Sequence, residues 1–118
     1  MAKRRTFVID LDGTMIKHRG ERDAAWSQWQ EFELLPHAVR LLNQLQSEGA
    51  FVVLLTGRKE SCRSRLTEAL SNRGVFYDAL VMGAGDGERV IVNDHGARAI
   101  AIDTNQEWKL DEDSDIRT

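Results

Sequence analysis

Residues 6–16 read TFVIDLDGTMI, an apolar run that passes directly into two aspartates one residue apart. The run at 6–9 has the length and composition of a short, buried β-strand. Asp10 and Asp12 follow it, and Gly13 permits a sharp backbone turn after the second carboxylate. Two carboxylates this close repel each other unless a cation compensates for their charge. The stretch therefore predicts a strand that delivers a charged site.

Apolar runs of strand length alternate with helical patterns along the rest of the chain, as in α/β folds with a parallel sheet. The run at 50–55 (AFVVLL) is continuous, which is typical of a strand covered by helices on both faces. Runs at 78–82, 89–93 and 98–102 predict three further strands. We expect a Rossmann-like, three-layer α/β sandwich with a mainly parallel sheet of about five strands.

Two helices are expected between these strands. The first lies within 36–49, with Pro36 in its first turn and Gly49 as its C-terminal cap. The second lies within 59–74 and ends at Gly74. Apolar residues recur at helical spacing in both; they are Val39, Leu42 and Leu45 in the first helix, and Cys62, Leu66, Ala69 and Leu70 in the second.

The remaining segments are less regular. Residues 17–35 contain Trp26, Trp29 and Phe32, and their pattern leaves open a short helix or a mobile flap. Residues 108–118 are acidic and aperiodic, so we expect a frayed tail after a single domain at 1–107.

Composition narrows the class of protein. The chain has 118 residues, 42% of them hydrophobic, and a net charge of −3. This balance argues against wholesale binding to nucleic acid or membranes. Its single cysteine, Cys62, excludes an internal disulfide and suits a reducing compartment. No apolar run reaches the length of roughly 18 residues that a membrane helix needs. We expect a cytoplasmic protein, monomeric by default.

The polar residues fall at the carboxyl ends of the apolar runs. Asp10 follows the first run, Thr56, Gly57 and Arg58 follow the second, and Asp94 follows the run at 89–93. Ligands of open parallel sheets bind beyond this edge. Asp10, Asp12 and Asp94 are the hard oxygen ligands that Mg²⁺ prefers. The hydroxyl of Thr56 and the backbone beside Gly57 are suited to bind phosphate oxygens.

These residue types suit phosphoryl transfer. One carboxylate beside a bound phosphate can attack phosphorus and form an aspartyl-phosphate, while a second protonates the leaving oxygen and later activates water. Each part alone is more often a turn or a helix cap, and Asn93-Asp94 is a good turn sequence. Because all of these residues follow predicted strands, in this order, we favour a functional site over a set of separate turns and helix caps.

The stretch FVIDLDGTMI resembles the first motif of the haloacid dehalogenase (HAD) superfamily, VVLLTGR resembles its second and VIVND its fourth. The resemblance implies a phosphatase with Asp10 as nucleophile and Asp12 as general acid/base. It implies that Thr56 binds the phosphoryl group, and that the side chains of Asp10 and Asp94 and the main-chain carbonyl of Asp12 hold Mg²⁺. The short interval between the first two motifs implies the branch without a large cap, whose open sites take large substrates or are closed by another subunit.

One motif departs from this pattern. The family's third motif supplies a lysine, but this chain has no lysine between Lys59 and Lys109, and Ala84 or Gly85 stands where one is expected. Arg89 is the nearest cation in sequence and is our candidate phosphate-binding replacement, with Arg58, Lys59 and Arg63 as alternatives. Arg98 also occupies a position where many relatives carry a second acid.

Two functions therefore stay open. The first is a magnesium-dependent phosphomonoesterase acting on a sugar phosphate or a 3′-phosphorylated polynucleotide end. The second is a weak or inactive module that binds metal and phosphate. A basic cluster, defined by Arg58, Lys59, Arg63, Arg65 and Arg73, is either a solvated helix face or an anionic-substrate rim. A response-regulator receiver is disfavoured, because its acidic pair and phosphorylated aspartate follow different strands.

Overall fold

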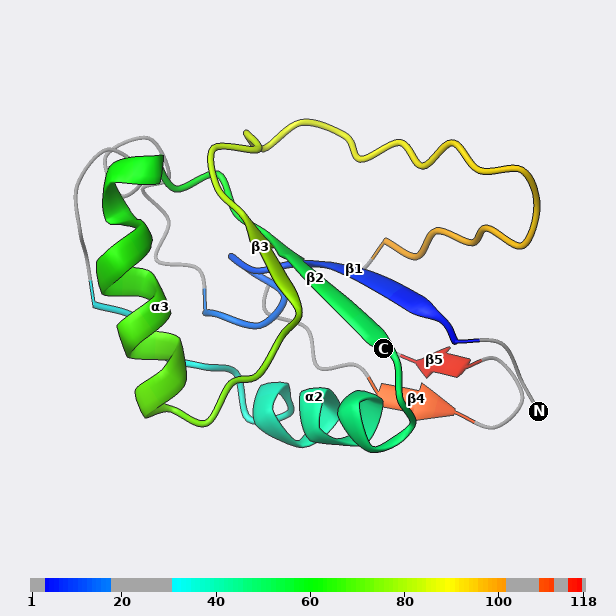
Figure 1. Ribbon diagram of the computed structural model, residues 1–118, viewed down its shortest axis with the longest axis horizontal. Coiled ribbons are helices and arrows are strands. Elements are labelled where there is room, and N and C mark those ends of the chain that lie inside the picture. The colour runs from blue at the N-terminus through cyan, green and yellow to red at the C-terminus, as the bar shows by residue number, and fades with distance from the viewer. Residues whose placement is uncertain (1–3, 18–30, 102–108, 112–114, 118) are drawn as a thin grey trace.

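The computed structural model describes residues 4–17, 31–101, 109–111 and 115–117 (Figure 1). No helix in these residues is long and apolar enough to cross a membrane. The elements follow in the order β1 (Thr6–Asp10), α2 (Ala38–Ser47), β2 (Phe51–Leu55), the 3₁₀ helix η1 (Glu60–Cys62), α3 (Arg63–Asn72), β3 (Ala79–Val81), β4 (Lys109–Asp111) and β5 (Asp115–Arg117).

The first three strands form a parallel sheet in the order β1-β2-β3. In this sheet Asp10 pairs with Leu55, and Leu55 pairs with Val81, so the three strands end at one level. The predicted strands at 6–9, 50–55 and 78–82 are confirmed, as is the α/β class. The shared level matters for the site, because whatever follows each strand emerges at the same edge.

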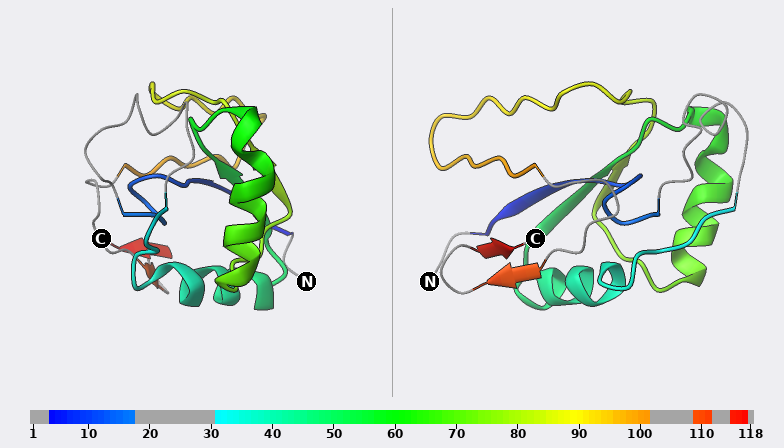
Figure 2. Two further views of the ribbon diagram at one scale, coloured as in Figure 1. Left: turned by 90° about the vertical axis from the view of Figure 1, so that its left-hand side faces the viewer. Right: turned by 180° about the vertical axis from the view of Figure 1, so that it is seen from behind.

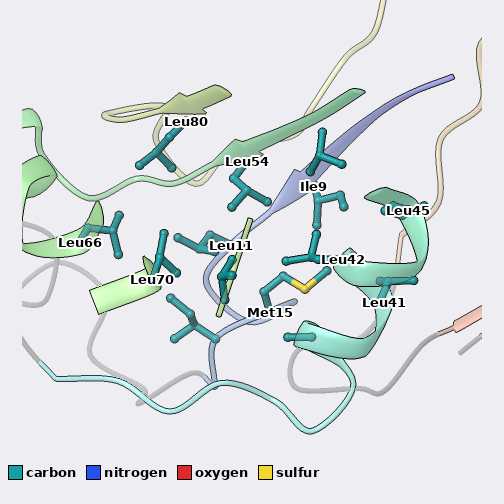
Figure 3. Packing of buried hydrophobic residues seen from close by; sticks show 14 of the residues in the cluster. Ile9, Leu11, Met15, Leu41, Leu42, Leu45, Leu54, Leu66, Leu70 and Leu80 are labelled. Atoms are coloured by element: carbon teal, nitrogen blue, oxygen red, sulfur yellow. The ribbon is translucent and has the colours of Figure 1, made fainter. Parts of the chain in front are cut away.

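One face of the sheet carries the hydrophobic core. Ile9, Leu54 and Leu80 point from β1, β2 and β3 toward the buried side chains of both helices (Figure 3). Each strand alternates in burial, since successive side chains point to opposite faces. The helix residues in this cluster are Ala38, Leu41, Leu42 and Leu45 of α2 and Leu66, Ala69 and Leu70 of α3. Both helices therefore cover the same face.

Both predicted helices are confirmed, together with the glycines that follow them. Gly49 and Gly74 have φ angles of +78° and +75°. These angles lie in the left-handed region, which glycine adopts without strain. The amide of Ala50 donates to the carbonyl of Leu45, and that of Val75 to the carbonyl of Leu70, so each chain reversal is hydrogen-bonded. These turns send the chain back into β2 and toward β3.

The predicted strands at 89–93 and 98–102 are not formed in the described residues. Residues 83–101 form a long irregular excursion at the end of the molecule opposite α2 (Figures 1 and 2). Val90, Ile91 and Val92 are exposed, and Val92 is 92% accessible. An apolar run becomes a strand only when a neighbouring strand satisfies its backbone groups, and no described residue does so for this run.

The sheet is accordingly smaller and thinner than expected. The face opposite the helices presents Val8 and Val81, each 43% accessible, so the described residues build two layers rather than three. The continuity of FVVLL suggested burial on both faces, but Val53 and Leu55 are only half-buried.

Two other regions differ in part from expectation. Within 108–118, β4 and β5 pair antiparallel, with Leu110 opposite Ile116, where a frayed tail was expected. Residues 31–35 are not helical, and Leu34 bridges to Ile16. Phe32 is buried in the core, whereas Trp26 and Trp29 lie outside the described residues.

Candidate active site

The backbone after β1 turns sharply at the carboxyl edge of the sheet. The amide of Leu11 still donates to the carbonyl of Leu55 (2.8 Å), which keeps the chain in line with the sheet through Asp10. The amides of Met15 and Ile16 then both donate to the carbonyl of Leu11 (2.9 Å each). Gly13 has a φ of +91°. Because glycine lacks a Cβ, it adopts this angle without strain and lets the tight loop close. The loop fixes where both carboxylates emerge.

Asp12 is held from two directions. The hydroxyl of Thr56 donates to Oδ2 of Asp12 at 2.7 Å. Nε of Arg58 donates to Oδ1 at 3.2 Å, and Nη2 of Arg58 lies 3.1 Å from the same oxygen. The side chains of Arg58 and Asp12 are only 5% and 10% accessible. Water therefore screens this ion pair weakly, and Asp12 is fixed in orientation.

Thr56 does not face the solvent as a phosphate ligand would. It is fully buried, and its hydroxyl accepts the amide hydrogen of Arg58 (3.1 Å) while donating to Asp12. Because a hydroxyl has one hydrogen to donate, that donor is used within the protein. In this conformation Thr56 and Arg58 both orient Asp12. The half-buried Gly57 lies between these two residues in the sequence.

Arg89 reaches Asp10 from the excursion after β3. Its Nη1 donates to the carbonyl of Ala84 (2.9 Å), and its Nη2 donates to that of Gly85 (2.8 Å). The same Nη2 lies 3.5 Å from Oδ1 of Asp10. The two residues standing where a lysine was expected therefore hold, through their carbonyl groups, a guanidinium against the predicted nucleophile.

Asp94 is not brought to the other acids. Its side chain is 94% accessible, and Oδ2 lies 3.0 Å from Nδ1 of His95. Among the described residues, no three histidine, cysteine, aspartate or glutamate side chains are arranged to hold a metal ion. The expected set of Asp10, Asp12 and Asp94 is thus incomplete, because the strand that should deliver Asp94 is not formed.

The comparisons with known proteins agree with this layout. The sequence matches the profile of the polynucleotide kinase (PNKP) phosphatase domain over residues 4–92, which span β1 to the excursion. The chain belongs to this family. It is therefore a phosphatase domain of the haloacid dehalogenase superfamily, and no large cap lies within its described residues. A comparison with curated proteins gave no significant match.

Two solved structures support the same fold for this HAD phosphatase domain. A chain of the Pnkp1/Rnl/Hen1 RNA repair complex aligns with 69% of it at 28% identity and a TM-score of 0.55. A conserved protein from Bacteroides thetaiotaomicron aligns with 66% at 26% identity and a TM-score of 0.52. A D,D-heptose 1,7-bisphosphate phosphatase from B. bronchiseptica, complexed with magnesium and phosphate, aligns with 69% at 21% identity and a TM-score of 0.49. The domain spans 58%, 28% and 51% of the chains from B. thetaiotaomicron, the repair complex and B. bronchiseptica, respectively.

The basic cluster of this HAD domain does not act as one surface. Arg58 is buried against Asp12, whereas Arg63 pairs with Glu60 on the surface. Arg73 packs over the ring of Phe32 (4.4 Å to the centroid). Lys59 and Arg65 are exposed. Sequence reasoning offered Arg58 only as a spare cation or rim residue and missed its contact with Asp12, although its position at the end of β2 placed it at the right edge.

Proposed function

We propose that this domain hydrolyses phosphomonoesters through an aspartyl-phosphate formed on Asp10, in the presence of Mg²⁺. The observation that carries the proposal is the contrast between the two carboxylates of the DxD motif. The side chain of Asp10 is 42% accessible, whereas that of Asp12 is 10% accessible and bonded at both oxygens. An accessible carboxylate suits a nucleophile, and a fixed one suits proton transfer to a defined atom.

The chemistry follows from these positions. A carboxylate oxygen of Asp10 attacks phosphorus, the ester P–O bond breaks, and the leaving oxygen takes a proton from Asp12, which enters this step as the protonated carboxyl group. A water molecule then attacks the acyl phosphate and gives its proton to Asp12, which releases inorganic phosphate and restores Asp10. Thr56 and Arg58 donate to the two oxygens of Asp12 and so orient its carboxylate form, the form that accepts the proton of the attacking water.

The position of Arg89 favours an enzyme over the alternative, a binding module without activity. A cation beside the nucleophile offsets the repulsion between Asp10 and an incoming phosphate, the role for which a lysine was expected. Arg89 lies 3.5 Å from Asp10, so its positive charge acts on that carboxylate. A guanidinium forms a planar fork and an ammonium a point charge, so we expect slower turnover than with lysine at this place.

The described arrangement does not fit Mg²⁺, because Asp94 points into solvent and no three acids converge among the described residues. We propose that the side chains of Asp10 and Asp94 and the main-chain carbonyl of Asp12 hold the ion when Asp94 lies beside Asp10. The chemistry of the donor set supports this, since carboxylate and carbonyl oxygens are the ligands that Mg²⁺ prefers.

For the substrate we propose a 3′-phosphorylated polynucleotide end, with a sugar phosphate as the second candidate. Support for the first comes from the matched family, which is named for polynucleotide kinase, and from the similarity to a chain of an RNA repair complex. The accessible side chain of Asp10 is consistent with a site that admits the end of a polymer.

The proposal is tested by phosphate release from 3′-phosphorylated oligonucleotides, sugar phosphates and an aryl phosphate, each with Mg²⁺ and with EDTA. The chain carrying Asp10→Asn is the key variant, and Glu68→Gln on the exposed face of α3 is the matched loss of one carboxylate. We expect turnover that needs Mg²⁺, disappears in Asp10→Asn and persists in Glu68→Gln. Retention of a hydroxylamine-sensitive, ³²P-labelled phosphate on the wild-type chain would identify the intermediate.

The outcomes separate the candidates. Preferred hydrolysis of the oligonucleotide supports the polynucleotide substrate, and preferred hydrolysis of a sugar phosphate replaces it with the second candidate. If no substrate turns over while Mg²⁺ still binds and raises the melting temperature, the binding module is the better description. Turnover that survives Asp10→Asn contradicts the nucleophile assignment.

A further inference from the structure

The ring of Phe32 lies against two arginines that come from different parts of the chain. Phe32 is 4% exposed and belongs to the hydrophobic core, in the irregular segment before α2. The guanidinium of Arg58 lies 5.5 Å from the centroid of this ring, and that of Arg73 lies 4.4 Å from it. A cation within about 6 Å of an aromatic centroid is attracted by the negative face of the ring, most strongly where water is excluded. The buried side chain of Arg58 meets that condition.

The backbone on both sides of Phe32 is tied to the loop after β1. The amide of Lys17 donates to the carbonyl of Glu33 at 2.8 Å. The amide of Leu35 donates to the carbonyl of Met15, also at 2.8 Å. The segment that carries the ring is therefore fixed to the same loop that carries Asp12.

Arg73 holds this segment from the end of α3. Its Nη1 donates to the carbonyl of Ala69 at 3.0 Å, which anchors the side chain to the last turn of the helix. Its Nη2 lies 3.5 Å from the carbonyl oxygen of Phe32 and 3.5 Å from Oε2 of Glu31. Together with the contact over the ring, these bonds give the ring of Phe32 a set position.

The contact of Arg58 with Phe32 complements its contact with Asp12. Nε and Nη2 of Arg58 lie 3.2 and 3.1 Å from Oδ1 of Asp12. The side chain of Phe32 has no polar atom, so it attracts the guanidinium without competing for these N–H groups. An aliphatic side chain would fill the same space but would not attract a cation in this way. The aromatic ring therefore contributes more than core packing requires.

We infer that Phe32 is a positioning residue: its ring fixes the guanidinium of Arg58 and, through it, the carboxylate of Asp12. Residues 31–35 are thereby coupled to the group that transfers protons, although Phe32 takes no part in the chemistry. The inference rests on the proposed function only in giving Asp12 its role in proton transfer.

Graded fluorination of Phe32 tests the inference with little change in the shape of the core. Fluorine draws negative charge away from the face of the ring, so mono-, di- and trifluorinated phenylalanine at position 32 weaken its attraction for a cation in steps. NMR of the full chain measures hydrogen exchange of the Nε–H of Arg58, which the bond to Asp12 protects. We expect exchange to accelerate with each added fluorine, and by roughly ten-fold in Phe32→Leu.

Phe7 of β1 provides the matched control. The guanidinium of Arg5 lies over its ring, 5.1 Å from the centroid, but Arg5 pairs with Glu48 and its side chain is 45% accessible. The same fluorinated residues at position 7, and Phe7→Leu, therefore alter a ring–arginine contact that does not involve Asp12. Exchange at Arg58 should not change in this series.

Turnover is the second measurement. Asp12 acts in the chemical step, so the substitutions at Phe32 should lower kcat in the same order as they accelerate exchange and should leave KM unchanged. Melting temperatures of both series show how much folded protein contributes to each rate. Phe32→Leu and Phe7→Leu each remove an aromatic ring that packs with the core, but only the first should lower kcat.

Three results overturn the inference. One is exchange at Arg58 that does not respond to fluorination of Phe32, since any effect of leucine would then reflect lost packing. Another is equal acceleration in the Phe7 series, which would indicate general loosening of the fold. The third is a kcat that stays constant while exchange accelerates, because Phe32 would then hold Arg58 without affecting the reaction. If the wild-type chain shows no turnover, the proposed function fails, and exchange at Arg58 still decides whether Phe32 is coupled to Asp12.

Discussion

Arg58 and Asp12, 46 positions apart in the sequence, form a buried ion pair with Nη2 of the arginine 3.1 Å from Oδ1 of the aspartate. The guanidinium also lies over the ring of Phe32, 5.5 Å from its centroid. The pair joins the end of β2 to the loop after β1, so it contributes to stability as well as to the site. Removing one partner leaves the other charged and buried.

Arg58→Ala should therefore destabilise the fold strongly. We expect a loss of roughly 3–5 kcal/mol in the free energy of unfolding, as is usual when one member of a buried ion pair is removed. Urea unfolding monitored by circular dichroism measures it. Arg65 lies on the exposed face of α3 and provides the control. Arg65→Ala should change stability by only about 0.5 kcal/mol or less. Equal midpoints for the two variants would contradict the buried pair.

Thr56→Val tests the role of the hydroxyl as an orienting group. The substitution keeps the shape but removes two hydrogen bonds, the one that the hydroxyl donates to Oδ2 of Asp12 and the one that it accepts from the amide of Arg58. We expect a loss of about 1–3 kcal/mol, the usual cost of unsatisfied buried polar groups. Thr56→Ser keeps both bonds and should recover most of that loss. If serine is as destabilising as valine, the methyl group rather than the hydroxyl is responsible.

Leu54→Ala tests which face of the sheet holds the core. Leu54 is fully buried between the sheet and both helices. Its truncation should therefore cost about 2–5 kcal/mol in unfolding free energy. Val8 lies on the opposite face and is 43% accessible. Val8→Ala should accordingly cost about 1 kcal/mol or less. Comparable losses at the two positions would show that the second face is also covered in solution.

Glu60 and Arg63 give a pH-dependent contribution at the start of α3. The hydrogen bond from Arg63 lowers the pKa of the Glu60 carboxyl, and the same contact raises the pKa of Arg63. Because the carboxyl pKa is lower in the folded state, its stabilising contribution is present above the ordinary glutamate range. That contribution is lost as the pH falls through the lowered value. Arg63→Ala should return the pKa of Glu60 toward its ordinary value in an NMR titration of the side chain, and an unchanged pKa would contradict the contact.

Local patterns were enough to predict the part of the fold that depends on neighbouring residues. The strands at 6–9, 50–55 and 78–82 and the two helices followed by Gly49 and Gly74 were predicted from apolar periodicity and glycine caps, which operate within a few residues. The DxD motif and the family also followed from short stretches. For the same reason, the strands expected at 89–93 and 98–102 were wrong for the described state. Their apolar pattern allows a strand, but pairing requires a partner elsewhere in the chain.

The contacts of the site were decided by tertiary structure. The sequence placed Asp10, Asp12 and Thr56 near one sheet edge and expected Asp94 there too, and it offered Arg89 only as the nearest cation in sequence. It did not indicate that Thr56 and Arg58 both turn inward to Asp12, or that the carbonyls of Ala84 and Gly85 direct Arg89 to Asp10. Which charges meet depends on side-chain directions at the ends of separate strands and on whether 89–93 is paired. The sequence alone determined which chemical groups are available to this edge. The fold decided their partners, because the contacts of Asp10 and Asp12 join residues from 44 to 79 positions apart.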